Sequence, residues 1–152
     1  MARSLTGIIR DARIANKNFS GAKVGMYGRE GDRNFSLSLD PEQGEQMLED
    51  GWNVKRKPGR EKGDPDRYYL NVAVSFKNYP PNIWLITSGG KTPLTEETVS
   101  RLDGCMFAKV DLELRGRVWE ADGGRGGVKA YLRAGYFTID EDVFASEYGI
   151  YE

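Results

Sequence analysis

Residues 107–139, FAKVDLELRGRVWEADGGRGGVKAYLRAGYFTI, form two runs of alternating apolar and polar residues around a glycine-rich centre. Such alternation is typical of strands with one face in the core, and a glycine-rich connection is typical of a hairpin. The pattern therefore predicts two long antiparallel strands joined at DGGRGG. The residues expected to face the core are Val110, Leu112, Leu114, Val118, Val128, Ala130, Leu132, Ala134 and Tyr136. The residues expected to face outward are Lys109, Arg115, Arg117, Trp119, Lys129, Tyr131, Arg133 and Phe137.

Shorter segments repeat the alternation. Residues 34–40 (NFSLSLD) and 68–76 (YYLNVAVSF) predict two strands whose apolar side chains point inward. Further strands are expected at the segments 21–28, 52–54 and 82–88, whereas Pro and Gly residues mark 55–67 as a loop.

Two short helices complete the pattern. Asp40 followed by Pro41 predicts a helix start, and Gly51 predicts its end. In TPLTEETVSRLDG, at residues 92–104, Thr95 is expected to cap a second helix.

These six or seven strands and two helices predict a mainly β fold, a small antiparallel barrel of the oligonucleotide-binding (OB) type with an acidic C-terminal tail. A length of 152 residues suits one domain. We place the OB-like nucleic-acid-binding domain at residues 1–139, and its first 19 residues form a leader or an edge strand. Residues 140–152 form the tail.

The amino-acid composition excludes several classes of catalytic and metal site. The chain has no histidine and a single cysteine, which removes the usual zinc sites and the Ser-His and Cys-His nucleophile systems. The glycine-rich stretches at 88–92 and 123–127 lack the spacing of a phosphate-binding P-loop. We therefore expect no enzymatic activity, no metal and no cofactor. Without an apolar run of about 18 residues or a secretory leader, we expect a cytoplasmic protein that does not enter membranes.

Charge is unevenly distributed. The net charge is −1, but the segment 140–152 (DEDVFASEYGIYE) has five acids and no base, which leaves 22 bases against 18 acids in residues 1–139. A mildly basic body with an acidic end suggests that the tail either avoids nucleic acid or competes with it for a basic groove.

The outward residues of the hairpin alternate cations with aromatic rings. Cations neutralise phosphates, and rings stack on unpaired bases whatever their identity, so the pattern favours sequence-independent binding of single strands. The expected stacking residues are Tyr69, Trp119 and Tyr131. The expected phosphate contacts are Lys55, Arg56, Lys57, Arg115, Arg117, Arg125, Lys129 and Arg133. The same pattern also suits rings that seal the barrel beneath solvated charges. A protein-interaction module that binds a host or phage protein through this aromatic face is the alternative function.

Several blocks of the chain resemble a family of bacteriophage single-stranded DNA-binding proteins of replication and recombination. The resemblance spans roughly residues 18–148 and rests on GDRNFSLSLD, DGWNVK, YYLNVAVSF, YPPNIWLITS, the segment from TEETVSRLD through VDLELR, and VWEADGGRGGVKAYLRAGYF. It implies an OB-type barrel with an aromatic and basic groove, located in the host cytoplasm. It also implies an acidic tail that covers the groove or docks replication and recombination proteins.

The tail residues that match this family pattern are Asp140, Glu141, Asp142, Phe144, Glu147, Tyr148 and Tyr151. The sequence leaves open whether the protein is a monomer or a homodimer.

Overall fold

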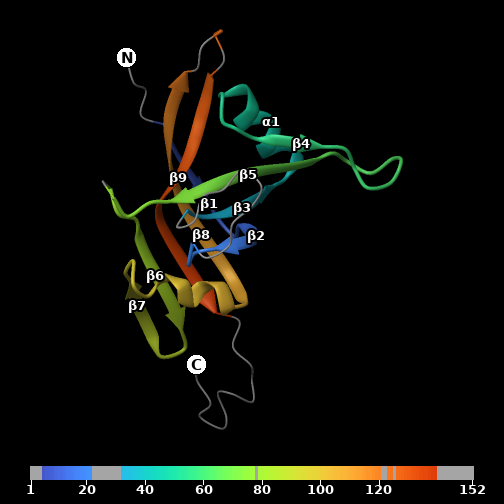
Figure 1. The fold of residues 1–152 in the computed structure, drawn as a ribbon. Coiled ribbons are helices and arrows are strands. Elements are labelled where there is room, and N and C mark those ends of the chain that lie inside the picture. The colour runs from blue at the N-terminus through green and yellow to red at the C-terminus, as the bar shows by residue number, and fades with distance from the viewer. Residues whose placement is uncertain (1–4, 22–31, 78, 121–122, 125, 140–152) are drawn as a thin grey trace.

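The predicted long hairpin forms the centre of the fold. In the computed structural model, β8 (Phe107–Glu120) and β9 (Gly126–Ile139) pair antiparallel along their length (Figure 1). The structure describes residues 5–21, 32–77, 79–120, 123–124 and 126–139. Residues 22–28 of the strand expected at 21–28, and the whole tail at 140–152, lie outside these ranges.

The other strands assemble around this hairpin into one sheet of nine strands, in the order β1-β8-β9-β5-β3-β2. β4 pairs with β5, and β6 joins β9 and carries β7. The strands outside the hairpin are β1 (Leu5–Ile9), β2 (Arg13–Asn18), β3 (Arg33–Leu39), β4 (Lys55–Lys57), β5 (Arg67–Val74), β6 (Asn82–Thr87) and β7 (Gly90–Leu94). β9 pairs parallel with β5 and with β6, which corrects the fully antiparallel prediction.

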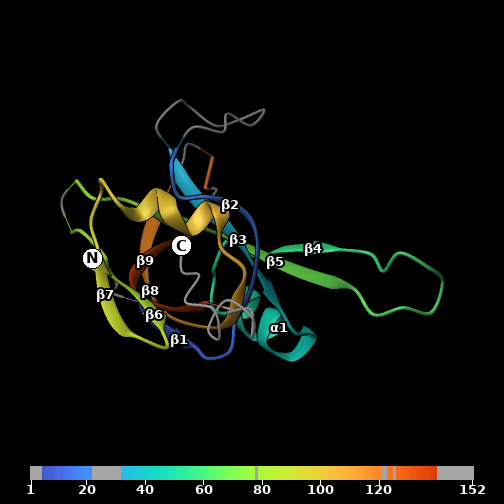
Figure 2. The same cartoon turned by 90° about the horizontal axis from the view of Figure 1, so that it is seen from below.

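The sheet curls around a common core but does not close (Figure 2). At the gap, the Ala12 N–H donates to the Val110 carbonyl at 2.6 Å, and within the described residues no strand ladder joins β2 to β8. The mainly β class with two helical elements and an OB-like arrangement is confirmed, as a barrel that is left open on one side.

Alternating strands fill the core as expected. Phe35 and Leu37 of β3 and Leu70 of β5 are fully buried. The Phe35 ring lies 5.4 Å from that of Phe19, which in turn meets the Phe137 ring edge-on at 5.5 Å. The three rings join β3, β9 and the segment after β2 into one cluster.

Helix α1 (Pro41–Glu49) begins where the sequence predicts. The Asp40 carboxylate accepts a hydrogen bond from the Gln43 backbone N–H at 2.8 Å. Gly44 lies directly on the Tyr68 ring, where a Cβ atom would overlap the Tyr68 side chain. The absence of a side chain at Gly44 therefore lets α1 pack closely against β5. Gly51, with φ of +94°, follows the end of the helix.

Several local expectations are wrong. The segment 1–19 contains two strands, β1 and β2, rather than a leader or one edge strand. Lys55–Lys57 form a strand instead of loop, and β7 was not predicted. Residues 52–54 make only an isolated bridge, between Trp52 and Val128. The second helix is a 3₁₀-helix, η1 (Val99–Gly104), so Thr95 does not cap it.

The largest error lies in β9. Glu113 pairs with Ala134 and Leu114 with Leu132, so Arg133 is an extra residue in a β-bulge. A one-residue insertion exchanges the two faces of the strand beyond it. Phe137 is therefore buried and Tyr136 is 43% exposed, the reverse of the prediction. Val118 is also exposed.

Candidate nucleic-acid interface

The outward side of the β8–β9 hairpin presents the predicted cations and rings together. Arg115 pairs with Tyr131 and Arg117 with Lys129, and directly opposite residues share a face. Arg115 Cζ lies 5.8 Å and Lys129 Nζ 5.2 Å from the centroid of the Tyr131 ring. The ring of Tyr131 is therefore flanked by two positive charges.

Tyr79, which the sequence analysis missed, extends this cluster. Tyr79 is 70% exposed, and Arg115 Cζ lies 4.5 Å from the centroid of its ring. Arg115 thus lies close to two tyrosines from different segments. In the sequence, Tyr79 is an aromatic residue in a Pro-rich turn, and this pattern does not indicate that Arg115 lies beside it.

Trp119 lies at the far end of the same face, since residues 115, 117 and 119 alternate outward. Its Nε1–H donates to Asn53 Oδ1 at 3.2 Å, and the side chain remains 40% exposed. Gly127 pairs with Trp119, and a Cβ atom at Gly127 would collide with Asn53 Oδ1. The missing side chain of Gly127 therefore makes room for the bond that orients the indole.

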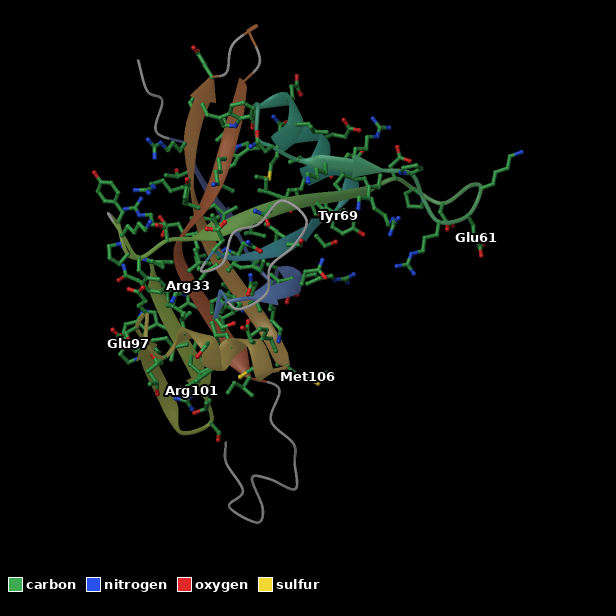
Figure 3. All side chains as sticks on the ribbon, in the orientation of Figure 1. Arg33, Glu61, Tyr69, Glu97, Arg101 and Met106 are labelled. Carbon is green, nitrogen blue, oxygen red and sulfur yellow. The ribbon has the colours of Figure 1, made fainter. Side chains whose placement is uncertain are left out.

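Strands β4 and β5 carry a second cluster around Tyr69 (Figure 3). Lys55 pairs directly with Tyr69, and Lys57 pairs with Arg67. Lys57 Nζ lies 5.7 Å and Arg67 Cζ 5.9 Å from the Tyr69 ring centroid. Arg67 Nη1 also donates to the Tyr69 hydroxyl at 3.4 Å. Arg67 was not among the predicted contacts, although it alternates in register with Tyr69.

The two clusters lie on one surface. Tyr131 pairs with Ala73 across the parallel β5–β9 contact, and Ala73, Asn71 and Tyr69 alternate outward on β5. Ser36 and Ser38 of β3 pair with Asn71 and Tyr69. The surface between the two clusters therefore carries small, uncharged side chains. We call this surface the aromatic–basic face; it comprises Lys55, Lys57, Arg67, Tyr69, Tyr79, Arg115, Arg117, Trp119, Lys129 and Tyr131.

Arg13 extends the surface at its β2 edge. It pairs with Ser38, which pairs with Tyr69, so Arg13, Ser38, Tyr69 and Lys55 form one row across four strands. Arg13 is exposed and was not predicted as a contact. The sequence analysis did not predict this row because it did not predict β2 and β4 as strands.

Arg56 lies apart from the aromatic–basic face. It pairs with Tyr68, on the opposite side of β5, and its guanidinium contacts Asp66 at 2.6 Å and Glu45 at 3.3 Å. The hydrogen bond to Asp66 raises the pKa of Arg56 above its ordinary value. Tyr68 donates to Glu45, and this bond raises the pKa of the phenol. This network ties α1 to β4 and β5.

Arg133 occupies the bulge and contacts Glu113 at 3.5 Å, so its charge is partly neutralised. Arg125 and every predicted tail residue lie outside the described residues. In the part of the chain that is described, no three His, Cys, Asp or Glu side chains gather in a way that could hold a metal ion. Nor does any described helix have the length and apolar character to cross a membrane.

The sequence model of a family described as "Putative phage ssDNA-binding domain" matches residues 3–150. No curated protein matches the chain.

Two solved structures, both of one bacteriophage protein, show the same fold. The single-stranded DNA-binding protein of bacteriophage Enc34 in complex with ssDNA superposes with a TM-score of 0.57 at 11% identity, over 90% of this chain and 88% of that chain. Its C-terminal truncation gives 0.56 at 11% identity, over 90% and 87%. The protein gp2.5 of bacteriophage T7 gives 0.43 at 12% identity, over 93% and 89%.

Proposed function

The chain belongs to the phage ssDNA-binding domain family, and we propose that it binds single-stranded DNA without sequence preference through the aromatic–basic face. The observation that carries the proposal is the repeated pairing of a partly exposed ring with cations, at Tyr131 and at Tyr69. Rings stack on any base while neighbouring cations neutralise the phosphates, which is the requirement for sequence-independent binding.

The residues divide into two roles. Tyr69, Tyr131, Tyr79 and Trp119 provide the stacking surfaces. Phosphates are held by the cations beside them, which are Lys55, Lys57, Arg67, Arg115, Arg117 and Lys129. Arg125 and Arg133 are proposed as further phosphate contacts. Arg56 instead contacts Glu45 of α1 and Asp66.

Residues 1–139 form the binding domain of this proposal and 140–152 the tail. We propose a non-enzymatic protein of the host cytoplasm, monomeric or homodimeric. Its tail competes with DNA for the aromatic–basic face or docks proteins of replication and recombination.

Salt dependence tests the electrostatic part. Each neutralised phosphate contributes about −0.7 to the slope of log K against log salt for single strands, so four contacts give a slope of about −3. Arg117→Gln should make this slope shallower by about 0.7. The measurement is a titration of fluorescent oligo-dT at several salt concentrations, with Lys91→Gln on β7 as the matched control. Affinity that does not change with salt would contradict the proposal.

Neutralising acids in the tail tests whether the tail competes with DNA. Asp140→Asn, Glu141→Gln and Asp142→Asn together should tighten oligo-dT binding severalfold at low salt, because a competing negative segment is weakened. The gain should shrink as salt rises and the charges are screened. Glu42→Gln and Glu49→Gln on α1, combined with Asp50→Asn at its C-cap, change the net charge equally and should not tighten binding. Equal affinities in the tail variant and the unmodified chain would leave protein docking as the role of the tail.

A further inference from the structure

Trp119 is held differently from the other proposed stacking residues. Tyr69 and Tyr131 each lie within a strand and have cations beside the ring. Trp119 is the second-last residue of β8 and is 40% exposed. A large exposed side chain samples several rotamers, and fixing it when a base binds costs affinity unless the ring is already held. The orientation of this indole therefore needs a source other than burial.

Asn53 provides that source. Its side-chain Oδ1 accepts the hydrogen bond from Trp119 Nε1–H at 3.2 Å. The backbone at Asn53 is itself fixed, because its N–H donates to the Val128 carbonyl at 2.9 Å. The two neighbours of Asn53 in the chain, Trp52 and Val54, are buried. Asn53 is thus an exposed side chain on an anchored backbone.

Gly127 is the residue that this hydrogen bond crosses. It pairs with Trp119, and a Cβ atom there would collide with Asn53 Oδ1 and lie 3.3 Å from Trp119 Nε1. The backbone of Gly127 does not require glycine, since its φ is not positive. Glycine inside a strand is unfavourable and often marks a place where another group needs the space. Side-chain space, rather than backbone conformation, therefore explains the glycine at this position.

The hydrogen bond also lies between the two clusters. β4 begins two residues after Asn53, and its first residue, Lys55, pairs with Tyr69. Burial alternates over residues 52–55, so Asn53 and Lys55 are both on the outward side. Residues 53–55 therefore separate Tyr69 on one side from Trp119 on the other. Fixing the indole through Asn53 sets its place relative to the Tyr69 cluster.

We propose that Asn53 is a positioning residue of the aromatic–basic face, which holds the Trp119 indole in place for base stacking. The inference rests on the proposed function, in which Trp119 stacks on a base. The contribution of Asn53 to binding then passes through the Nε1–H of Trp119. Asn53→Ala should weaken oligo-dT binding about 3-fold to 12-fold, the cost of ordering one large side chain on binding.

A double-mutant cycle tests this path. Trp119→Phe keeps an aromatic ring but has no N–H donor, so adding Asn53→Ala to it should weaken binding by less than about twofold. The measurement is fluorescence anisotropy of labelled oligo-dT at fixed low salt. Asn82→Ala, at an exposed asparagine of β6, is the matched control and should bind like the unmodified chain. Equal losses from Asn53→Ala in the two backgrounds, or no loss in either, would overturn the proposal.

Gly127→Ala is an independent variant, because its methyl group displaces the Asn53 amide without removing a donor or an acceptor. It should weaken oligo-dT binding about as much as Asn53→Ala. The two substitutions together should weaken binding little more than either one alone, since both act on the same hydrogen bond. Losses that add in full would contradict the proposal.

Nuclear magnetic resonance of the indole N–H groups shows the bond without DNA. The chain has three tryptophans, and Trp119→Phe identifies the resonance of Trp119. Asn53→Ala should move this resonance upfield, because the proton loses its acceptor, and Asn53→Asp should restore it, because it keeps an acceptor oxygen. The Trp52 and Trp84 resonances should stay in place, which shows that the variants are folded. A Trp119 resonance that does not move would overturn the proposal.

The two measurements separate this inference from the proposed function. If the unmodified chain does not bind oligo-dT, the proposed function is wrong and the role of Asn53 falls with it. If the unmodified chain binds but Asn53→Ala and Trp119→Phe act independently, only the role of Asn53 is wrong.

Discussion

Tyr69→Ala combined with Tyr131→Ala is expected to weaken oligo-dT binding by about 2–6 kcal/mol, roughly 30-fold to 20,000-fold. Each ring offers one stacking surface, and loss of base stacking costs about 1–3 kcal/mol per base. Tyr69 and Tyr131 belong to separate clusters. Tyr131 pairs with Ala73, and the four residue steps along β5 from Tyr69 to Ala73 span about 13 Å. At that distance the two single losses should add.

The measurement is fluorescence anisotropy of labelled oligo-dT at fixed low salt. Tyr136→Ala is the matched control, since Tyr136 is an exposed tyrosine on the same strand but pairs with Asp111 and Trp84. It should bind like the unmodified chain. Tyr69→Phe should also bind well, because it keeps the ring and loses only the bond from Arg67. If the double variant binds as tightly as Tyr136→Ala, stacking at these two positions is wrong.

Local patterns predicted the parts of the fold whose cause is local. Alternation placed Phe35 and Leu70 in the core, and Asp40 with Pro41 marked the start of α1. The outward residues of the hairpin before the bulge, Arg115 to Trp119 and Lys129 to Tyr131, were assigned to the correct face for the same reason.

The candidate site was harder because several of its neighbours come from distant segments. Lys55, Arg56 and Lys57 were treated alike when 55–67 was expected to be a loop. As a strand, the segment directs Lys55 and Lys57 to Tyr69 and Arg56 to the acids beside α1. Tyr79 meets Arg115 only through the tertiary fold.

The bulge at Arg133 has no signal in the alternation, because an inserted residue leaves apolar and polar residues in plausible order on both sides. Beyond it, Ala134 and Gly135 are buried in succession. A Cβ atom at Gly135 would overlap the Phe137 ring, so glycine is what lets that ring lie against its own strand. The sequence shows a glycine at position 135, but it does not indicate that the Phe137 ring fills the space beside it.

Phe137→Ala is therefore expected to lower the free energy of unfolding by about 3–5 kcal/mol, the usual cost of deleting a buried aromatic ring. Phe137 is fully buried, and its ring lies 5.5 Å from Phe19 and 5.3 Å from Phe107. Tyr136→Ala should cost less than about 1 kcal/mol, since that side chain is largely on the surface. Urea unfolding followed by circular dichroism measures both. A regular strand without the bulge would bury Tyr136 and expose Phe137, so the opposite ranking of the two variants would refute the bulge.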